Sequence, residues 1–368
     1  MIPISKPIIP KNAKKKLLEC LKSGWISGAG PIVVSFEREF ARFVGTKYAV
    51  SCTSGTTALH LALAALGIGP GDEVIVPTFT MISTILPVIY VGATPVLVDS
   101  EADTGNIDVS LIESKITKKT KAVMPVHLYG HPVDMEPLLK LVEKNRLAII
   151  EDAAEAHGAQ YQLKKVGSIG DLGCFSFYAN KIVTSGEGGM VTTNDKRLAE
   201  KLKSLRNLAR TPKKHFYHQE VGFNYRLSSL QAALGLASLE EVTTILKQKR
   251  HIASLYRKLL SLLPHVILPV EKNYASSVFW HYAIVIKKTS PKSRNQLAEM
   301  LAKKDVETRT FHIPMHIQPA LVNLGLFKGE RYPNAEFLSK NGLLLPSGPN
   351  ISDRQIATVC SLIQKFMS

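Results

Sequence analysis

Short runs of apolar residues alternate with segments of helical periodicity through the first two-thirds of the chain. The short runs favour strands, and the segments between them favour helices. This alternation is typical of a mostly parallel sheet whose strands are joined by crossover helices. Seven strands are predicted in one large α/β domain, at residues 48–52, 73–76, 94–98, 122–125, 148–151, 174–176 and 189–193.

Helical periodicity predicts an apolar helix over residues 56–66 and the end of another over 138–144. A longer helical pattern begins within residues 228–242 and continues through Leu263, where Pro264 and Pro269 end it. We interpret this pattern as one long helix that links two domains.

The last third of the chain predicts a strand over 279–286 and helices over 294–303 and 352–366, which together form a smaller α+β domain. We therefore predict a large domain over residues 1–245 and a small C-terminal domain over residues 246–368.

Composition fits a globular protein. Of the 368 residues, 45% are hydrophobic, which is enough for one large core or two smaller ones and excludes a disordered or collagen-like chain. The formal net charge of +16 could attract polyanions, phosphorylated metabolites or an anionic membrane surface. The basic residues are scattered in short groups such as residues 14–16 and 303–304, so we expect a solvated basic surface and no nucleic-acid site.

Neither a membrane span nor an export signal is expected. Residues 74–98 carry no charge, but Pro77, Pro87, Gly92 and Pro95 interrupt them, which favours a buried strand, helix and strand. The first 18 residues lack the apolar core of a signal peptide. The four cysteines form no CxxC pair, so we expect a reducing cytoplasm, with neither a disulfide framework nor a zinc site.

Candidate chemistry gathers around two acidic residues and one lysine. Asp152 follows Glu151 at the end of an apolar strand, where open α/β sheets place ligand-binding groups. Lys181 follows another strand and precedes the glycine-rich loop 186–190. A strand-end Asp and a loop Lys are the minimum set for pyridoxal phosphate (PLP), because the Lys forms a Schiff base and the Asp keeps the ring nitrogen protonated. A surface lysine and a helix-capping aspartate are the alternative, which spacing alone favours.

A candidate phosphate site lies between the first predicted strand and the helix after it. Ser54, Gly55 and Thr56 would direct backbone N–H groups and hydroxyls at an anion, under the positive end of the helix dipole. An ordinary Ser/Thr helix cap is the alternative. The chain has no GxxxxGK[ST] loop and no strand–GxGxxG–helix unit, which excludes the usual nucleoside-triphosphate and dinucleotide sites.

At these residues the sequence resembles the DegT-type sugar aminotransferases, PLP-dependent enzymes with the aspartate aminotransferase fold. The sequences of residues 177–181 and 184–190 are most similar to those of the branch that makes GDP-perosamine or related 4-amino-4,6-dideoxy sugars. The resemblance covers nearly the whole chain and is carried by residues 23–27, 54–56, 77–80, 125–130, 151–158, 170–190, 222–226, 315–319 and 332–336.

The resemblance implies roles for named residues. Lys181 would form the Schiff base and move the proton, and Asp152 would pair with the pyridine nitrogen. Relatives that dehydrate the sugar carry His at the position of Lys181, so transamination is expected. The other implied cofactor contacts are Ser54, Gly55, Thr56 and Ser176 for the phosphate, Glu155 for the ring hydroxyl, Met81 for the ring face, and Asn224 for the phosphate of a neighbouring subunit in a homodimer.

Substrate contacts are expected from Ser27, Arg309 and His316, since residues 308–312 and His316 match a stretch that lines the sugar-nucleotide pocket of the family. The Arg309 guanidinium can bind two phosphate oxygens, and a surface salt bridge is nearly as good an account of it. His127, His131, His312 and His316 form two His-x-x-x-His spacings, which we do not interpret as a metal site. His127 and His131 are expected to be structural.

The resemblance implies transfer of an amino group from L-glutamate to C4 of a nucleotide-linked 4-keto-6-deoxyhexose, best matched by conversion of GDP-4-keto-6-deoxymannose to GDP-perosamine for polysaccharide or O-antigen synthesis. Alternative acceptors are dTDP-4-keto-6-deoxyglucose, a 3-keto sugar nucleotide and a keto-cyclitol. Two non-enzymatic alternatives are a PLP-binding regulatory protein and a polyanion-binding protein, but neither would need a proton-shuttling lysine.

Overall fold

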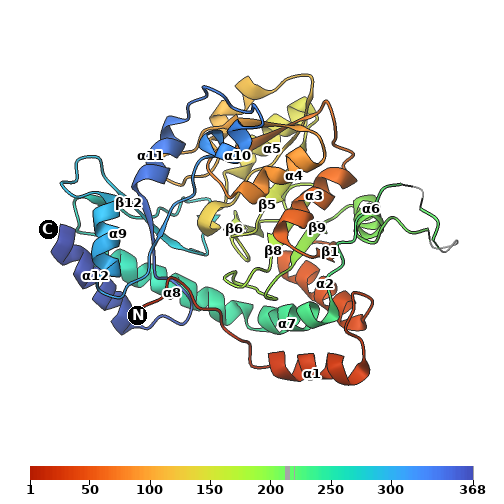
Figure 1. Cartoon of the computed structure of the whole chain (residues 1–368), viewed down its shortest axis with the longest axis horizontal. Coiled ribbons are helices and arrows are strands. Elements are labelled where there is room, and N and C mark those ends of the chain that lie inside the picture. The colour runs from red at the N-terminus through yellow and green to blue at the C-terminus, as the bar shows by residue number, and fades with distance from the viewer. Residues whose placement is uncertain (212–215, 219, 368) are drawn as a thin grey trace.

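The computed structural model describes residues 1–211, 216–218 and 220–367 (Figure 1). A seven-stranded sheet forms the centre of the large region. Its strands are β1 (Tyr48–Cys52), β2 (Glu73–Pro77), β3 (Thr94–Val98), β4 (Thr120–Val123), β5 (Ala148–Asp152), β8 (Leu172–Ser176) and β9 (Gly189–Thr193). Their order is β1-β9-β8-β5-β4-β2-β3. β9 runs antiparallel to both of its neighbours, β1 and β8, and the other pairs of the sheet are parallel.

All seven predicted strands are present, and their ends differ from the prediction by at most two residues. The predicted fold class is thereby confirmed. The central strands are buried along almost their whole length, as β8 and β9 illustrate. Strands covered on both faces consist of continuous apolar runs, which is why the sequence identifies them so well.

Helices cover both faces of this sheet (Figure 1). The helix α2 (Pro31–Val44) was not predicted by the sequence analysis. Pro31 occupies its first position, and Gly45, in the left-handed conformation, follows its last residue. The helices of the large region are α1 (Ala13–Ser23), α2 (Pro31–Val44), α3 (Gly55–Ala65), α4 (Leu86–Tyr90), α5 (Met135–Asn145), α6 (Lys196–Arg206) and α7 (Ser229–Glu240), with 3₁₀ turns η1 (Ile82–Thr84), η2 (Val109–Leu111), η3 (Glu113–Lys115) and η4 (Leu128–Gly130).

The uncharged stretch 74–98 forms β2, η1, α4 and β3, as predicted. Within the part of the chain that the structure describes, no helix is both long enough and apolar enough to span a membrane.

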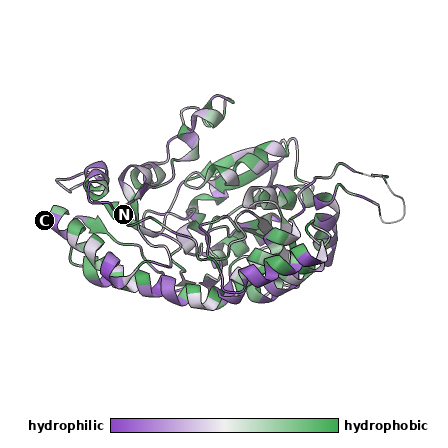
Figure 2. Cartoon of the chain, turned by 60° about the horizontal axis from the view of Figure 1, so that its bottom comes forward, coloured by the Kyte–Doolittle hydropathy of each residue, from purple (hydrophilic) through white to green (hydrophobic). Residues whose placement is uncertain are grey.

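The predicted single helix over 228–263 is two helices. Between α7 and α8 (Val242–Leu260), Glu241 has φ −99° and ψ 1°, outside helical geometry. Three β-branched residues, Val242, Thr243 and Thr244, follow this break, and such residues are poor at continuing a helix. The two helices run in succession across the lower part of Figure 1, where α1 lies below α7. In the turned view of Figure 2, hydrophilic and hydrophobic residues alternate along the helices at the lower edge.

A smaller antiparallel sheet, in the order β10-β12-β14-β13, lies in the C-terminal region. Its strands are β10 (Val266–Ile267), β12 (Tyr282–Ile286), β13 (Arg309–Thr310) and β14 (Gly342–Leu345). The helices of this region are α9 (Arg294–Ala302), α10 (Pro319–Val322), α11 (Pro333–Asn341) and α12 (Asp353–Met367), with the 3₁₀ turn η5 (Met315–Ile317).

Two further contacts connect the regions. A three-stranded sheet joins β11 (Ala275–Ser276) to β6 (Gln160–Tyr161) and β7 (Lys164–Lys165) of the large region. At the other end of the chain, Ile2 forms a parallel bridge with Val306. Ile2 also packs against the C-terminal hydrophobic core, to which α8, α9, α12 and β12 contribute. The domain boundary at residue 245 stays a prediction.

Candidate active site

A cavity of about 470 Å³ opens where the parallel strands of the large sheet end. Residues that follow five of these strands line one side of it: Ser54, Gly55 and Thr56 after β1, Thr80, Met81 and Ser83 after β2, Val126 and Tyr129 after β4, Asp152, Ala154 and Glu155 at the end of β5 and after it, and Ser176, Tyr178, Asn180 and Lys181 at the end of β8 and after it. We call this set the strand wall. Open parallel sheets bind ligands at this edge.

The opposite side of the cavity comes from the C-terminal region. Trp280 and His281 precede β12, and Arg309 and Thr310 form β13. We call the set Trp280, His281, Arg309, Thr310, His312 and Leu344 the C-terminal wall. The cavity therefore lies between two parts of the chain that are far apart in sequence.

The β1–α3 turn presents a helix N-terminus to the cavity. Ser54 Oγ accepts a hydrogen bond from Thr57 N (3.1 Å), and Thr57 Oγ1 accepts one from Ser54 N (2.9 Å). Ser54 is thus the helix cap that the alternative reading of this segment predicted. The cap uses the N–H of Thr57 and leaves those of Gly55 and Thr56, at the positive end of the helix, free for an anion.

Ser176, at the end of β8, lies against this helix N-terminus. A Cβ atom at Gly55 would stand only 2.8 Å from Ser176 Cβ, so no larger residue fits at position 55 without a shift. The close approach brings the Ser176 hydroxyl beside the first turn of α3. A hydroxyl beside unpaired N–H groups at a helix N-terminus could hold a phosphate group.

Of the two acidic residues at the end of β5, only Asp152 lines the cavity. Asp152 is 5% exposed, and its carboxylate accepts hydrogen bonds from Thr84 Oγ1 (2.9 Å) and Ala154 N (3.2 Å). Burial raises the pKa of Asp152. A cationic N–H within the cavity would relieve that cost, because it would supply a charge partner for the buried carboxylate.

Glu151 points to the other face of the sheet, as alternation along a strand requires. Its carboxylate accepts hydrogen bonds from the N–H groups of Gly167, Ile169 and Gly170 and lies 3.0 Å from His127 Nε2. Because His127 Nδ1 accepts from Val133 N (3.1 Å), Nε2 must carry the proton that is donated to Glu151. His127 is buried in this network. No cluster of metal-ligating side chains occurs among residues 1–211, 216–218 and 220–367.

Lys181 projects into the cavity from the loop after β8. Its Nζ lies 3.6 Å from the centroid of the Trp280 ring and 3.9 Å from Glu155 Oε1. Burial lowers the pKa of Lys181, while the charges of Glu155 and Asp152 act in the opposite direction. Trp280 Nε1 donates a hydrogen bond to the carbonyl of Asn180 (2.9 Å), which fixes the ring against the lysine loop.

Glu155 connects both walls. Its Oε2 accepts a hydrogen bond from Tyr129 N (2.8 Å), and its Oε1 lies 3.6 Å from His312 Nε2. Although burial acts to raise the pKa of Glu155, the charges of Lys181 and His312 lower it to about 2. Glu155 is therefore a carboxylate over the whole physiological range of pH.

Three predicted site residues lie outside the cavity lining of this chain: Ser27, Asn224 and His316. His316 is buried instead between Thr78 (3.0 Å) and Glu336 (3.3 Å). Ser27 and Asn224 are exposed. Met81 and Arg309 do line the cavity, and Arg309 also lies 3.6 Å from Glu307 at the surface.

Trp280, Tyr129 and Thr84 are site residues that the sequence analysis did not single out. Thr84 lies inside the uncharged stretch 74–98, and Trp280 lies in the predicted strand 279–286, so neither stood out from residues of the core. Tyr129 has φ 49°, a conformation that is uncommon for residues other than glycine.

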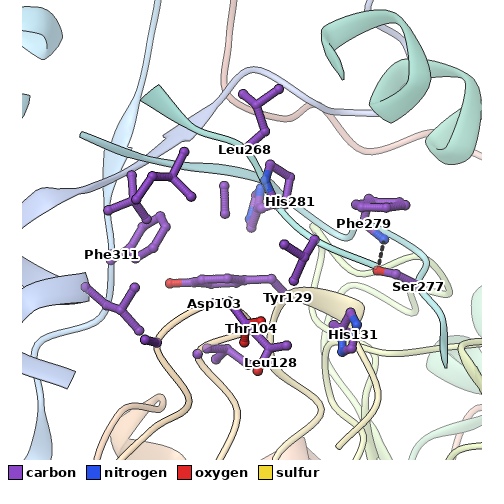
Figure 3. A pocket seen from close by; sticks show the side chains of 18 of the residues that line it. Asp103, Thr104, Leu128, Tyr129, His131, Leu268, Ser277, Phe279, His281 and Phe311 are labelled. Carbon is purple, nitrogen blue, oxygen red and sulfur yellow. Dashed lines mark hydrogen bonds between the residues drawn. The ribbon is translucent and has the colours of Figure 1, made fainter. Parts of the chain in front are cut away.

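A second cavity of about 50 Å³ lies behind this site (Figure 3). Tyr129 and His281 line both cavities and so form the partition between them. Tyr129 Oη and His281 Nδ1 are buried and have no hydrogen-bond partner in the described part of the chain. The lining of this cavity is mostly apolar, but a space of this size has room for a water molecule, which could bind to these two polar atoms.

Comparisons with known proteins agree with this geometry. The chain is 42% identical to a GDP-perosamine synthase of Caulobacter vibrioides over 100% of its own length and 98% of that protein, and 42% identical to another of Escherichia coli O157:H7 over 100% and 99%. The solved PLP form of Spr1654, a putative sugar aminotransferase of Streptococcus pneumoniae, matches with a TM-score of 0.93 and 30% identity over 100% of both chains. The family description "DegT/DnrJ/EryC1/StrS aminotransferase family" matches residues 7–364. The predicted family is confirmed, and the chain belongs to the DegT/DnrJ/EryC1/StrS aminotransferases.

Proposed function

We propose that this aminotransferase uses PLP to transfer an amino group from L-glutamate to C4 of GDP-4-keto-6-deoxymannose, a nucleotide-linked 4-keto-6-deoxyhexose. The observation that carries the cofactor assignment is the meeting of Lys181, Asp152 and the N-terminus of α3 at one cavity. The similarity to two GDP-perosamine synthases supports the choice of acceptor.

The residues of the strand wall fit each polar group of PLP. The free N–H groups of Gly55 and Thr56 and the Ser176 hydroxyl would hold the phosphate. Asp152 would hold the protonated ring nitrogen. This cation would stabilise the ionised form of the buried carboxylate, whose pKa burial raises. Asn180 Oδ1, buried at the same cavity without a hydrogen-bond partner in the described residues, is a further acceptor toward a ligand.

Bound PLP supplies an aldehyde for the amino group and a ring that withdraws electrons from the substrate carbon. Among the described residues, Lys181 is the one amine in the cavity lining, so it would anchor the cofactor and move the proton at the substrate carbon. Trp280 and Glu155 hold its Nζ from two sides. Glu155 is the proposed contact of the ring hydroxyl, and Met81 that of the ring face.

The substrate would enter past the C-terminal wall. Arg309 is exposed at the cavity, where its guanidinium could bind the diphosphate of a sugar nucleotide. The net charge of +16 would also favour an anionic substrate, without selecting its base. Ser27 and His316 remain proposed substrate contacts, although His316 is enclosed by Thr78 and Glu336 in this structure.

A homodimer completes the proposal. Asn224 is exposed and lies outside the cavity of its own chain, as expected of a residue that contacts the phosphate in a second copy. Mixing Asn224→Asp with Lys181→Ala tests this arrangement, because a mixed dimer would contain one intact site. We expect about a quarter of wild-type activity after random exchange. Mixed samples that stay as inactive as the separate variants would contradict the shared site.

The central experiment follows the visible absorption of the purified protein with PLP. L-Glutamate should bleach the band of the bound cofactor, and GDP-4-keto-6-deoxymannose should restore it, with the 4-amino sugar identified by mass spectrometry. Bleaching without restoration would leave an aminotransferase with another acceptor, for which dTDP-4-keto-6-deoxyglucose, a 3-keto sugar nucleotide and a keto-cyclitol are the next substrates. A protein that binds PLP but resists bleaching would match a regulatory role. Protein that takes up no PLP would refute the assignment.

Polysaccharide or O-antigen synthesis in the cytoplasm is the setting that this reaction implies. GDP-linked sugars are donors for glycosyl transfer, so the product would be consumed by a glycosyltransferase. A strain that lacks the protein should then lose the 4-amino sugar from its surface polysaccharide, which compositional analysis would measure.

A further inference from the structure

One carboxylate oxygen in the cavity lies between two nitrogen bases. Glu155 Oε1 is 3.9 Å from Lys181 Nζ and 3.6 Å from His312 Nε2. The other oxygen, Oε2, accepts the hydrogen bond from Tyr129 N. Both bases therefore face the same oxygen of a carboxylate that its backbone contact holds in place.

His312 is held in position on its own side. Its ring stacks on that of Tyr129, with centroids 5.5 Å apart and planes inclined by 20°. Its Nε2 is buried and has no hydrogen-bond partner among the described residues. A buried polar atom without a hydrogen bond is costly, and the Glu155 carboxylate is the group at ion-pair distance that a protonated Nε2 would bind.

Among the described residues, Glu155 is the one carboxylate within ion-pair distance of either base. Asp152 also favours the ammonium form of Lys181, but no ion pair joins Asp152 to either base in the described part of the chain. Either Lys181 or His312 can neutralise Glu155 by becoming a cation, and a cation at one base makes a second cation at the other less favourable, so the two bases compete for a proton. The other ionisable groups that line the same cavity are Tyr129, Asp152, Tyr178, Glu187, His281 and Arg309.

We propose that His312 is a positioning residue for the proton of Lys181, and that it takes this proton through Glu155 whenever Lys181 has to act as a free base. The proton leaves Nζ, which keeps its electron pair, and binds the lone pair of Nε2 to form an imidazolium. Glu155 is a carboxylate before and after the transfer, so the net charge of the site is unchanged. The inference rests on the proposed function in one respect, the role of Lys181 as the reacting amine.

The structure gives a reason why Lys181 needs a second base, His312, as a proton store. Lys181 must be neutral to take a proton from a substrate carbon, but the Trp280 ring face and Glu155 both favour its ammonium form. Its side chain is only 10% exposed, so transfer to bulk water is hindered. A neighbouring base that shares the same counterion accepts the proton without creating a new unpaired charge.

Histidine NMR titration of the apoenzyme tests the coupling without any turnover. In Lys181→Ala, His312 becomes the sole cationic partner of Glu155, whose remaining contact is the Tyr129 N–H, and we expect the His312 titration to move to higher pH than in the wild type. In Glu155→Gln the His312 titration should move to lower pH. Exposed His251, which pairs with Asp353 on the surface, is the internal control and should not move. An unchanged His312 titration in both variants would overturn the proposal. Lys181→Met replaces Lys181→Ala if the latter fails to fold.

A second measurement uses the rate at which the apoenzyme combines with PLP, which needs neutral Lys181. In the wild type, the state with the proton on His312 keeps some Lys181 neutral at low pH, so the rate should level off between the two pKa values of the pair. In His312→Gln it should keep falling about tenfold per pH unit. Profiles of the same shape would refute the proton store. Absence of PLP uptake would instead refute the proposed function, and the NMR titration would still decide the coupling.

Discussion

The two walls of the cavity are built in different ways. The strand wall consists of residues at the ends of buried parallel strands. Nearby backbone N–H groups donate hydrogen bonds to their side chains and hold them in place, as for Ser54 and Asp152. The C-terminal wall is held by contacts between distant segments: Trp280 bonds to the Asn180 carbonyl, and Lys249 Nζ donates to the Trp280 carbonyl at 2.8 Å. In the proposed function, the strand wall would supply the groups that hold the cofactor, and the C-terminal wall would supply charged groups on the side of the substrate.

The largest expected effect comes from the strand wall. Lys181→Ala should lower formation of the amino sugar by at least about a thousandfold, because no other amine of the described part of the chain lines the cavity. Product formation followed by mass spectrometry measures this loss. The fold should persist, with cooperative thermal unfolding. Lys140→Ala, at an exposed position on α5, is the matched control and should leave activity unchanged. Appreciable turnover in Lys181→Ala would remove the basis of the cofactor assignment.

The strand wall could be predicted from sequence because its positions follow from strand ends. Once continuous apolar runs identify the strands, Asp152 and Lys181 stand out as charged residues directly after them. Ser54 shows the limit of this reasoning. The helix cap and the phosphate site are alternatives in the sequence, but the cap seen in the structure is compatible with the proposed phosphate site. The cap pairs the N–H group of Thr57 and leaves those of Gly55 and Thr56 for a ligand.

The C-terminal wall could not be predicted in the same way. Trp280 and His312 occupy no periodic position that marks them as site residues, and they reach the cavity only through packing of the two regions. His316 looked equivalent to His312 in sequence, yet it is enclosed between Thr78 and Glu336. Which histidine of the pair faces a cavity depends on tertiary contacts that local patterns do not contain.

A second prediction tests how closely the strand wall is fitted to a phosphate. In Gly55→Ala, the new Cβ would meet Ser176 Cβ at 2.8 Å and move the first turn of α3 away from β8. We expect PLP to bind about tenfold more weakly, the equivalent of one lost hydrogen bond to a charged group. Titration of the apoenzyme with PLP measures the affinity. Gly69→Ala is the control, since its Cβ would have no neighbour closer than 3.6 Å. Equal affinity in both variants would mean that this approach is not part of the cofactor site.

A third, smaller effect is expected from the C-terminal wall. Arg309→Ala should raise the KM for the sugar nucleotide by about fivefold and leave that for L-glutamate unchanged, because an exposed ion pair contributes about 1 kcal/mol. Steady-state kinetics with each substrate varied in turn measures the two constants. Arg197→Ala, which disrupts the exposed Arg197–Asp195 pair outside this cavity, is the control. An equal rise in both constants would indicate a general disturbance of the site and not a substrate contact.

The last prediction concerns stability and not catalysis, and its subject is Lys249, which donates a hydrogen bond to the carbonyl of Trp280. Lys249 is 3% exposed and donates to the carbonyls of Trp280 and Ser347, and no ion pair with a carboxylate is found for it in the described residues. Burial lowers the pKa of Lys249 to about 7. In the unfolded chain a lysine has a pKa near 10.4.

Between about pH 7 and 10 the unfolded chain therefore binds a proton that the folded chain lacks, so the free energy of unfolding gains a contribution that rises with pH across this window. Lys249→Met should remove that slope. The loss of two hydrogen bonds to carbonyls also lowers stability, but by the same amount at every pH, so the slope and not the absolute stability is diagnostic. Thermal unfolding of both proteins from pH 6.5 to 9.5 measures it, with Lys140→Met as the exposed control. Parallel slopes in the wild type and Lys249→Met would show that Lys249 stays charged when buried, and that the C-terminal wall, like Asp152 in the strand wall, tolerates a buried ion.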